Sequence, residues 1–338
     1  MKKIFQSILL FSFALLLPMA AAAQKKPVER GYNAITIEQS KNYVEFLADD
    51  LLQGRDAGKP GGYIAARYIV SLLREWGVQP FFESGYYQPF EAANVVTPMR
   101  NSWEINPDSI ACIKAEGFFQ TRRMNNILAV IPGELTDECV IVGAHYDHLG
   151  LQSDVYVDGL YNGADDNASG VSAVLQIAKA MVATGKRPLR TVIFAFWDGE
   201  EKGLLGSKHF VNNWDNHSRI KAYMNFDMVG RGPVEKPRYL KYFYTEAHPA
   251  FGEWLREDCK ERGFIFEPDY IAWDRPIGGS DNGPFARVDV PIVWYHTEGH
   301  PDYHRPSDSA DKIDYPKLLD ITRAAYLCAW RMANEKEY

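Results

Sequence analysis

The feature that most constrains the fold of this 338-residue chain is a series of short apolar runs, with helix-like segments between several of them. Each run has the length and composition of a buried strand, and helical spacing is found at 169–183, 203–213, 248–262 and about 315–334. This alternation predicts an α/β fold, a three-layer sandwich whose central mixed, largely parallel β-sheet is covered by helices on both faces. The runs are NNILAVI, ECVIVGAH, RTVIFAFWD, KAYMNFDM, RYLKYFYT and VPIVWYH.

The amino-terminal segment differs from the rest of the chain. Two lysines precede an apolar stretch from Ile8 to Leu17, and three alanines at 21–23 offer a small-residue cleavage site, so residues 1–23 are expected to be a secretory signal peptide. The alternative is a membrane anchor, but this stretch is much shorter than the roughly 20 residues that a spanning helix needs. We therefore expect an exported protein, periplasmic or extracellular, without membrane insertion after signal removal.

Residues 24–338 are expected to form a single catalytic domain, because no repeat, low-complexity tract or long linker divides them. Residues 24–100 are expected to pack on this domain as a helical and strand portion, with helical spacing at 36–52 and 62–76 on either side of the loop LQGRDAGKPGG. The net charge of −7 argues against nucleic acid or an anionic membrane as partner.

The four cysteines, Cys112, Cys139, Cys259 and Cys328, are far apart and form no CxxC pair. Their spacing disfavours a cysteine zinc site or a thioredoxin-like redox motif. Cys139 and Cys328 lie in apolar runs and are expected in the core. An exported protein can form disulfides, but four cysteines allow three complete pairings, and the sequence does not choose among them.

Four of the apolar runs carry an ionisable side chain at or beyond their carboxyl end. ECVIVGAH ends in His145, RTVIFAFWD leads to Glu200 and Glu201, KAYMNFDM contains Asp227, and VPIVWYH runs on to His304. In open α/β sheets the loops at this edge converge on one crevice, where ligand sites form. We therefore expect these side chains to lie close together.

Each motif also has an ordinary structural explanation when it is taken alone. An HxD can be a surface hydrogen-bonded pair, the DD of NGADDNASG can cap a helix, paired glutamates can form a solvated first turn, and a loop histidine needs no ligand. These explanations must each place a charge independently at the same sheet edge. A pair of divalent cations explains them together, with ligands Asp165, Glu201, Asp227, His145 and His304.

The charge balance of this expected cluster suits two Zn²⁺ ions per chain. Two such ions against three carboxylates leave one positive charge, which a bridging hydroxide cancels, and a near-neutral cluster tolerates a poorly solvated pocket. Adjacent residues on a turning backbone point in different directions, so Glu200 and Glu201 cannot both serve one ion equally. One of them is expected to be a ligand and the other the general base that moves a proton from the metal-bound water to the leaving amine.

Taken in order, the motifs resemble those of the secreted zinc aminopeptidases of metallopeptidase family twenty-eight, which use a co-catalytic metal pair. The resemblance covers nearly the whole chain after residue 23. It implies a zinc-dependent exopeptidase, an aminopeptidase that hydrolyses amino-terminal residues from peptide substrates by means of a metal-bound hydroxide. The motifs are LxGRDAGKPGG, GAHYDHLG, NGADDNASG, GEEKGLLGS, NFDMVGR, GGSD and DYHRPSDSADKI.

The resemblance also implies a role for each ligand. His145 and Asp227 would hold one zinc ion, Glu201 and His304 would hold the other, and Asp165 would bridge the two. The family commonly has a cis peptide between the two aspartates of its DD motif, which are Asp165 and Asp166 here.

Three further residues receive catalytic roles from the resemblance. Glu200 would be the general base, and Asp147 would be the carboxylate that orients the ring of His145. Tyr303 would hydrogen-bond the oxyanion, although a packed loop tyrosine is an equal alternative. One departure is Asn282, which stands where the family often has the histidine of SDH, so substrate preference does not transfer from relatives.

Two alternatives to an aminopeptidase are also compatible with this fold. A glutaminyl-peptide cyclotransferase has the same fold but typically uses one zinc ion and forms pyroglutamate without hydrolysis; the GEEKGLLGS segment looks more like the hydrolases. A catalytically inactive, metal-stabilised envelope binding protein is expected to lack a ligand or the base, and none is missing. The sequence does not specify the preferred amino-terminal residue, single-residue or dipeptide release, the native metal or the oligomeric state.

Overall fold

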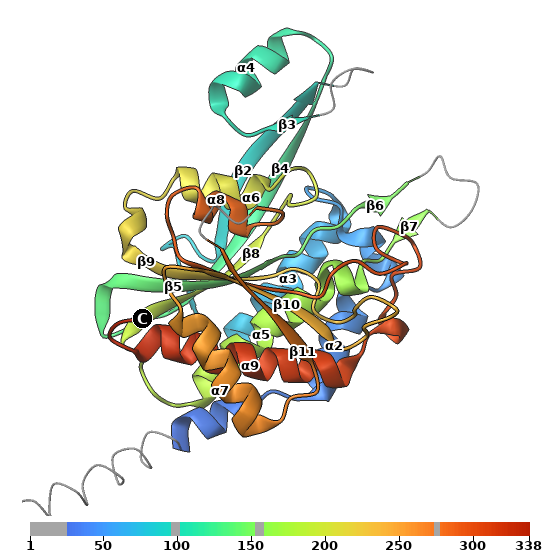
Figure 1. Ribbon diagram of the computed structural model, residues 1–338. Coiled ribbons are helices and arrows are strands. Elements are labelled where there is room, and N and C mark those ends of the chain that lie inside the picture. Colours follow the sequence, from blue (N-terminus) through green and yellow to red (C-terminus); the bar gives the residue numbers. More distant parts are fainter. Residues whose placement is uncertain (1–25, 96–101, 153–158, 274–277) are drawn as a thin grey trace, which may run out of the picture.

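The computed structural model describes residues 26–95, 102–152, 159–273 and 278–338 and contains a ten-stranded sheet between layers of helices (Figure 1). The expected α/β class is confirmed. The expected signal peptide, residues 1–23, lies outside the described residues. The strands of this sheet are β1 (Gln79–Pro80), β2 (Tyr87–Val95), β3 (Trp103–Glu104), β4 (Phe119–Ile131), β5 (Leu135–His145), β8 (Arg190–Trp197), β9 (Ile220–Phe226), β10 (Tyr239–Thr245), β11 (Glu267–Trp273) and β12 (Ile292–His296).

The centre of the sheet is parallel and its edges are mixed. The strand order is β11-β10-β12-β9-β5-β8-β4-β2-β3, with β1 paired to β4 outside this path. β5 runs parallel to both of its neighbours, β8 and β9, and β12 runs parallel to β9. Antiparallel pairing begins at β4 on one side and at β10 on the other. The central strands therefore end together at one edge of the sheet.

Helices cover both faces of the sheet because alternate strand residues point to opposite sides. Val140 and Val142 of β5 belong to a core shared with α2, α3, α5, α7 and α9, whereas Ile141 faces a second core shared with α6 and α8. Residues 26–33 are helical, and the helices that follow are α2 (Ile37–Leu47), α3 (Pro60–Glu75), α4 (Pro107–Ala115), α5 (Gly170–Ala183), α6 (Leu205–Asn212), α7 (Ala250–Arg262), α8 (Asn282–Ala286) and α9 (Tyr315–Asn334).

An arm projects from this body. It consists of the far ends of β2 and β4 together with β3 and α4 (Figure 1). Asn106 caps the start of α4, because its side chain accepts hydrogen bonds from the backbone N–H groups of Asp108 and Ser109. Ile110 and Ile113 of this helix pack on Ala93 and Val95 of β2 in a small separate core. A second small hairpin, β6 (Gly150–Leu151) with β7 (Leu160–Tyr161), lies on another side of the body.

The four cysteines are unpaired in the structure. Cys139 and Cys328 are buried, as expected from the apolar runs that contain them. Among the described residues, none of the helices combines the length and the apolar character that crossing a bilayer requires.

The sheet core predicts a large difference between two phenylalanines. Phe194 in β8 is 0% exposed and Phe118, just before β4, is 78% exposed. Phe194→Ala should lower the free energy of unfolding by about 3–5 kcal/mol, because it removes a buried ring and leaves a cavity. Phe118→Ala should change it by less than about 0.5 kcal/mol. Urea unfolding followed by circular dichroism measures both, and similar losses in the two variants would contradict this packing.

Candidate metal centre

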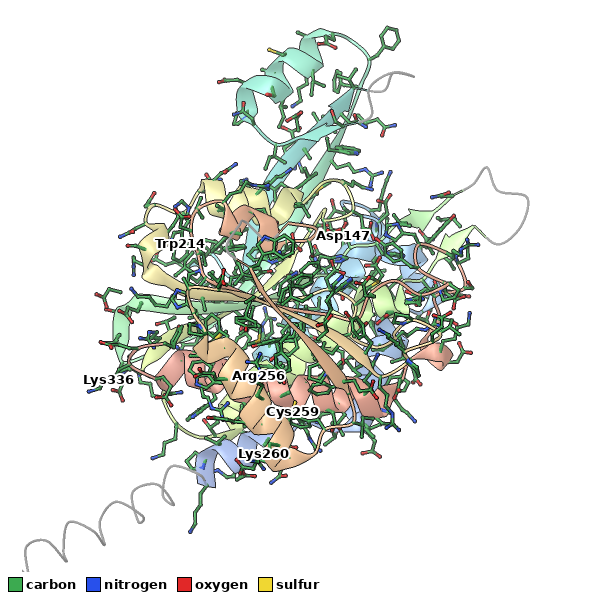
Figure 2. The ribbon with its side chains drawn as sticks, in the orientation of Figure 1. Asp147, Trp214, Arg256, Cys259, Lys260 and Lys336 are labelled. Atoms are coloured by element: carbon green, nitrogen blue, oxygen red, sulfur yellow. The ribbon has the colours of Figure 1, made fainter. Side chains whose placement is uncertain are left out.

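The parallel strands bring their polar residues to one edge of the sheet. β5 ends at His145, the turn after β8 carries Glu200 and Glu201, and Asp227 follows β9 directly. Asp147, two residues beyond β5, lies in Figure 2 on the side of the body nearest the arm, whereas the labelled residues of α7 lie on the opposite side. The edge expected from the sequence is therefore the edge at which the side chains meet.

Asp166 is the carboxylate at the centre of this group. It lies in an irregular turn, Ala164–Ser169, that leads into α5. One oxygen, Oδ1, is 3.3 Å from Nε2 of His145, and the other, Oδ2, is 3.1 Å from Nε2 of His304. Since each oxygen faces a different imidazole, this one side chain can contact two ions at once.

The remaining side chains divide into two overlapping groups around Asp166. In the first group, Nε2 of His145 is 3.6 Å from Oδ1 of Asp227. In the second, Nε2 of His304 is 3.3 Å from Oε2 of Glu201. His145, Asp227 and Asp166 offer ligand atoms within 4.8 Å of one another, and so do Glu201, Asp166 and His148.

The structure places Asp165, the expected bridging ligand, outside both ligand groups. Its Oδ1 accepts a hydrogen bond from the backbone N–H of Gly230 at 2.6 Å, and its Oδ2 is 3.2 Å from Nε2 of His300. Consecutive side chains in this turn point apart, so only Asp166 reaches both His145 and His304. The cis peptide is also one residue later than expected, between Asp166 and Asn167.

Asp308 holds the backbone of this aspartate pair. Its carboxylate accepts hydrogen bonds from the backbone N–H of Asp165, at 3.0 and 3.1 Å, and from that of Asp166 at 3.1 Å. Burial raises the pKa of Asp308 to about 6, an effect that the charge of Asp165 reinforces. Asp308 therefore supports the turn without belonging to either ligand group.

Asp147 contacts His145 in a different way from the one expected. Its backbone oxygen is 3.2 Å from Nδ1 of His145, while its nearest carboxylate oxygen is 3.8 Å away. The carboxylate is engaged elsewhere, because Oδ1 accepts the backbone N–H of Glu200 at 3.0 Å. Asp147 therefore lies beside both His145 and Glu200: its backbone oxygen faces the His145 ring, and its carboxylate holds the turn that carries Glu200.

Tyr303 lies at the mouth of the site. Its ring stacks on that of His304, with centroids 3.9 Å apart, and the residue is 42% exposed. Tyr303 and His304 line an open cavity of about 660 Å³ together with Tyr161, Arg305, Pro306 and Ser307. A peptide entering this cavity would therefore meet both rings.

The sequence analysis missed His148, which is fully buried in the second group. Its Nδ1 is 2.7 Å from Oε1 of Glu201, a hydrogen-bond distance, and its Nε2 has no hydrogen-bond partner among the described residues. The signal was present, because His148 directly follows the HxD motif of His145 and Asp147. The spacing alone does not reveal that the chain turns back after β5 and points both imidazoles into one site.

The pKa values of His145, His304 and Glu200 are shifted upward, as expected where negative charges are crowded together. Burial alone lowers the pKa of His145, but Glu200, Asp166 and Asp227 outweigh it and raise the pKa well above its ordinary value. Burial likewise opposes protonation of His304, yet Asp166 and Glu201 raise its pKa to about 10. Burial raises the pKa of Glu200; His145 opposes this rise, and Asp227 adds to it.

These side chains fit a divalent metal centre. Imidazole nitrogens mixed with carboxylate oxygens are a typical zinc donor set. The clustered carboxylates pull protons onto the neighbouring histidines, so a cation at this point would relieve their mutual repulsion. The structure therefore contains groups that could bind a metal, with Asp166 shared between them.

Comparison with known sequences identifies relatives of this chain. The sequence model of Peptidase family M28 matches residues 126–329. Leupeptin-inactivating enzyme 1 of Streptomyces exfoliatus is 30% identical over 169 residues, which are 49% of this chain but only 34% of that enzyme. A probable leucine aminopeptidase of Arthroderma otae is 27% identical over 278 residues, 80% of this chain and 74% of the relative.

Solved structures share the fold. The LapA aminopeptidase of Legionella pneumophila has a TM-score of 0.67 and 20% identity, over 93% of this chain and 75% of that one. A glutaminyl cyclase of Porphyromonas gingivalis has a TM-score of 0.60 and 16% identity, over 87% and 98%. At these identities the likeness concerns the fold alone. The family match, in contrast, spans more than half of the sequence, and it shows that this chain is a member of Peptidase family M28.

Proposed function

We propose that this protein is a zinc-dependent aminopeptidase that removes amino-terminal residues from peptides. The observation that carries the proposal is the central position of Asp166 between two groups of ligands. Family membership supports a peptide substrate, and the cavity lined by Tyr303 and His304 is open to one.

The proposed centre would hold two zinc ions per chain. His145 and Asp227 would hold the first, Glu201 and His304 would hold the second, and Asp166 would be shared between them. His148 donates a hydrogen bond from Nδ1 to Glu201 and so fixes the orientation of that ligand, as outer partners of metal ligands commonly do. This assignment keeps four of the five ligands expected from the sequence and replaces Asp165 by Asp166.

A bound zinc pair supplies Lewis acidity, which polarises the scissile carbonyl and lowers the pKa of the attacking water. Glu200 accepts the proton of this water at its carboxylate and returns it to the leaving amine. The backbone N–H of Glu200 is tied to Asp147, which keeps the base beside the ligands. Tyr303, at the cavity mouth, donates its phenolic hydrogen to the oxygen that becomes negative in the transition state.

The proposal includes the organisation of the chain and its location. Residues 24–338 act as a single catalytic domain, because α2 and α3 from the amino-terminal portion share the core of α5 and α9. Residues 1–23 direct export to the periplasm or the extracellular space, as their charged, apolar and small-residue order indicates.

The two neighbouring aspartates give a matched test of the ligand assignment. Asp166→Asn should lower zinc affinity by more than about 100-fold, beyond the range typical of changes outside the ligand shell. Asp165→Asn should keep the zinc content, since an amide oxygen can still accept the N–H of Gly230. Metal analysis after dialysis measures both. Loss of zinc in Asp165→Asn with retention in Asp166→Asn would reverse the assignment.

The activity itself is tested by product analysis on two peptides, one beginning with leucine and one with glutamine. We expect hydrolysis of the leucine peptide with release of its first residue, two zinc ions per chain, and no activity after treatment with a chelator. Glu200→Gln serves as the control and should keep its zinc while losing about 10²–10⁴-fold in turnover. Loss of ammonia from the glutamine peptide without shortening, with one zinc ion bound, would instead show a cyclotransferase.

A further inference from the structure

A left-handed turn precedes α3 and points one arginine into the body of the protein. Gln53, Gly54 and Arg55 have φ angles of 48°, 65° and 47°. This region is unfavourable for residues with a Cβ atom and persists where the surroundings fix it. Here the surroundings are close, because a Cβ at position 54 would lie 2.3 Å from the backbone oxygen of Tyr161. The turn therefore holds Arg55 against the segments that lead to the metal centre.

Arg55 is 1% exposed, and its guanidinium is surrounded by backbone oxygens. Each of its three nitrogens donates to at least one carbonyl, and these carbonyls come from three separate segments of the chain. The acceptors are Tyr146 at 2.8 Å from Nε, Leu47 at 2.5 Å and Asn162 at 2.6 Å from Nη1, and Gly163 at 2.9 Å and Asp166 at 3.4 Å from Nη2.

These contacts reach the backbone of both ligand groups. Tyr146 stands between His145 and Asp147, and Asp166 is the shared carboxylate itself. The backbone oxygen of Arg55 also accepts the N–H of His148 at 3.2 Å. One residue thus fixes the loop after β5 and the turn before α5 relative to each other.

The positive charge of Arg55 has no carboxylate partner within ion-pairing distance in the described part of the chain. Burial lowers the pKa of Arg55 to about 10, and the nearby charges of Asp166 and Asp308 oppose that fall. The group therefore stays protonated at neutral pH, and its direct contacts are all with neutral carbonyls. Its fork of donors, rather than an ion pair, is what joins the segments.

We propose that Arg55 is a positioning residue for the metal centre. It sets the spacing between His145 and Asp166 by crosslinking the carbonyl of Tyr146, the residue after His145, to that of Asp166. The inference rests on the proposed zinc site and names no new ligand. Lysine keeps the charge but has a single nitrogen and no planar fork, so it cannot reach the same set of carbonyls. Arg55→Lys therefore separates the geometry of the side chain from its charge.

The chain offers a matched control in Arg190. This arginine is 5% exposed and also donates to backbone carbonyls, those of Met332 at 3.1 Å, Lys336 at 2.8 Å and Glu335, together with the carboxylate of Glu138. It stands at the start of β8, whereas the metal centre lies beyond the end of that strand. Arg190→Lys therefore disturbs a similar buried group far from the ligands.

The experiment compares zinc affinity and thermal stability in the wild-type protein and the two lysine variants, with a chromophoric chelator as competitor. We expect Arg55→Lys to bind zinc about 10–100-fold more weakly, as removal of an outer partner of metal ligands commonly does. Arg190→Lys should lower the melting temperature and leave zinc affinity within about twofold of wild type. Circular dichroism confirms that each variant is folded at the assay temperature.

The outcomes separate this inference from the proposed function. Wild-type protein that binds no zinc would refute the function itself. Wild-type affinity in folded Arg55→Lys, or an equal loss in Arg190→Lys, would overturn the positioning role alone. If Arg55→Lys does not fold, Arg55→Ala is assayed with added guanidinium ion. Recovery of zinc affinity there supports the inference, and failure to fold under both conditions would make Arg55 a folding residue and contradict it.

Discussion

Buried carboxylates repel one another, and the centre of this molecule crowds several of them into one crevice. Asp166 offers a ligand atom within 4.8 Å of one from Asp227 and a ligand atom within 4.8 Å of one from Glu201, and Glu200 lies close enough to interact with their charges. Without a metal, the repulsion is relieved only in part, because the carboxylates raise the pKa of His145 and His304 and so favour their positively charged forms. A pair of divalent cations would relieve the repulsion more fully, because each ion would bring two positive charges to the point where a proton brings one. The proposed roles of the ligands, the base and the supporting residues all depend on relieving this repulsion.

In this fold the rigid strands and the polar groups of the site are different parts of the chain. Parallel strands in the centre of the sheet are packed on both faces, so the points where β5, β8 and β9 end are fixed by two cores rather than by the site. The turns beyond the strands then place the polar groups. Those turns are held by residues that bind no metal in our account: Asp308 on the aspartate pair, Asp147 on the Glu200 turn, and Arg55 on the backbone behind both.

The sequence predicted the parts of the site that depend on strand ends. His145, Glu201 and Asp227 follow apolar runs at short distances, so the strand pattern alone places them at one edge. It did not separate Asp165 from Asp166, because both lie in one turn and the path of the backbone decides which carboxylate faces the histidines. His148 and Arg55 were missed for a related reason. Their roles depend on hydrogen bonds between loops that are distant in sequence, and no periodic pattern records such contacts.

The fold was predictable to a similar degree. Regular alternation indicated the central strands and α5, α7 and α9, whereas the arm was not foreseen. Its strand β2 carries Pro89 and Glu91 within nine residues and shows no clean alternation. Its short helix α4 shares with β2 a cluster of only four buried apolar residues, two from each element, so little hydrophobic pattern marks it. Elements that bury little apolar surface leave a weak trace in the sequence.

The proposed centre requires that one carboxylate, Asp166, contacts two metal ions. Anomalous diffraction from crystals of the zinc-loaded protein, collected on both sides of the zinc absorption edge, locates the ions. We expect two strong peaks with Asp166 between them, one beside His145 and Asp227 and the other beside Glu201 and His304. A single peak, or a peak bound by Asp165 in place of Asp166, would contradict it.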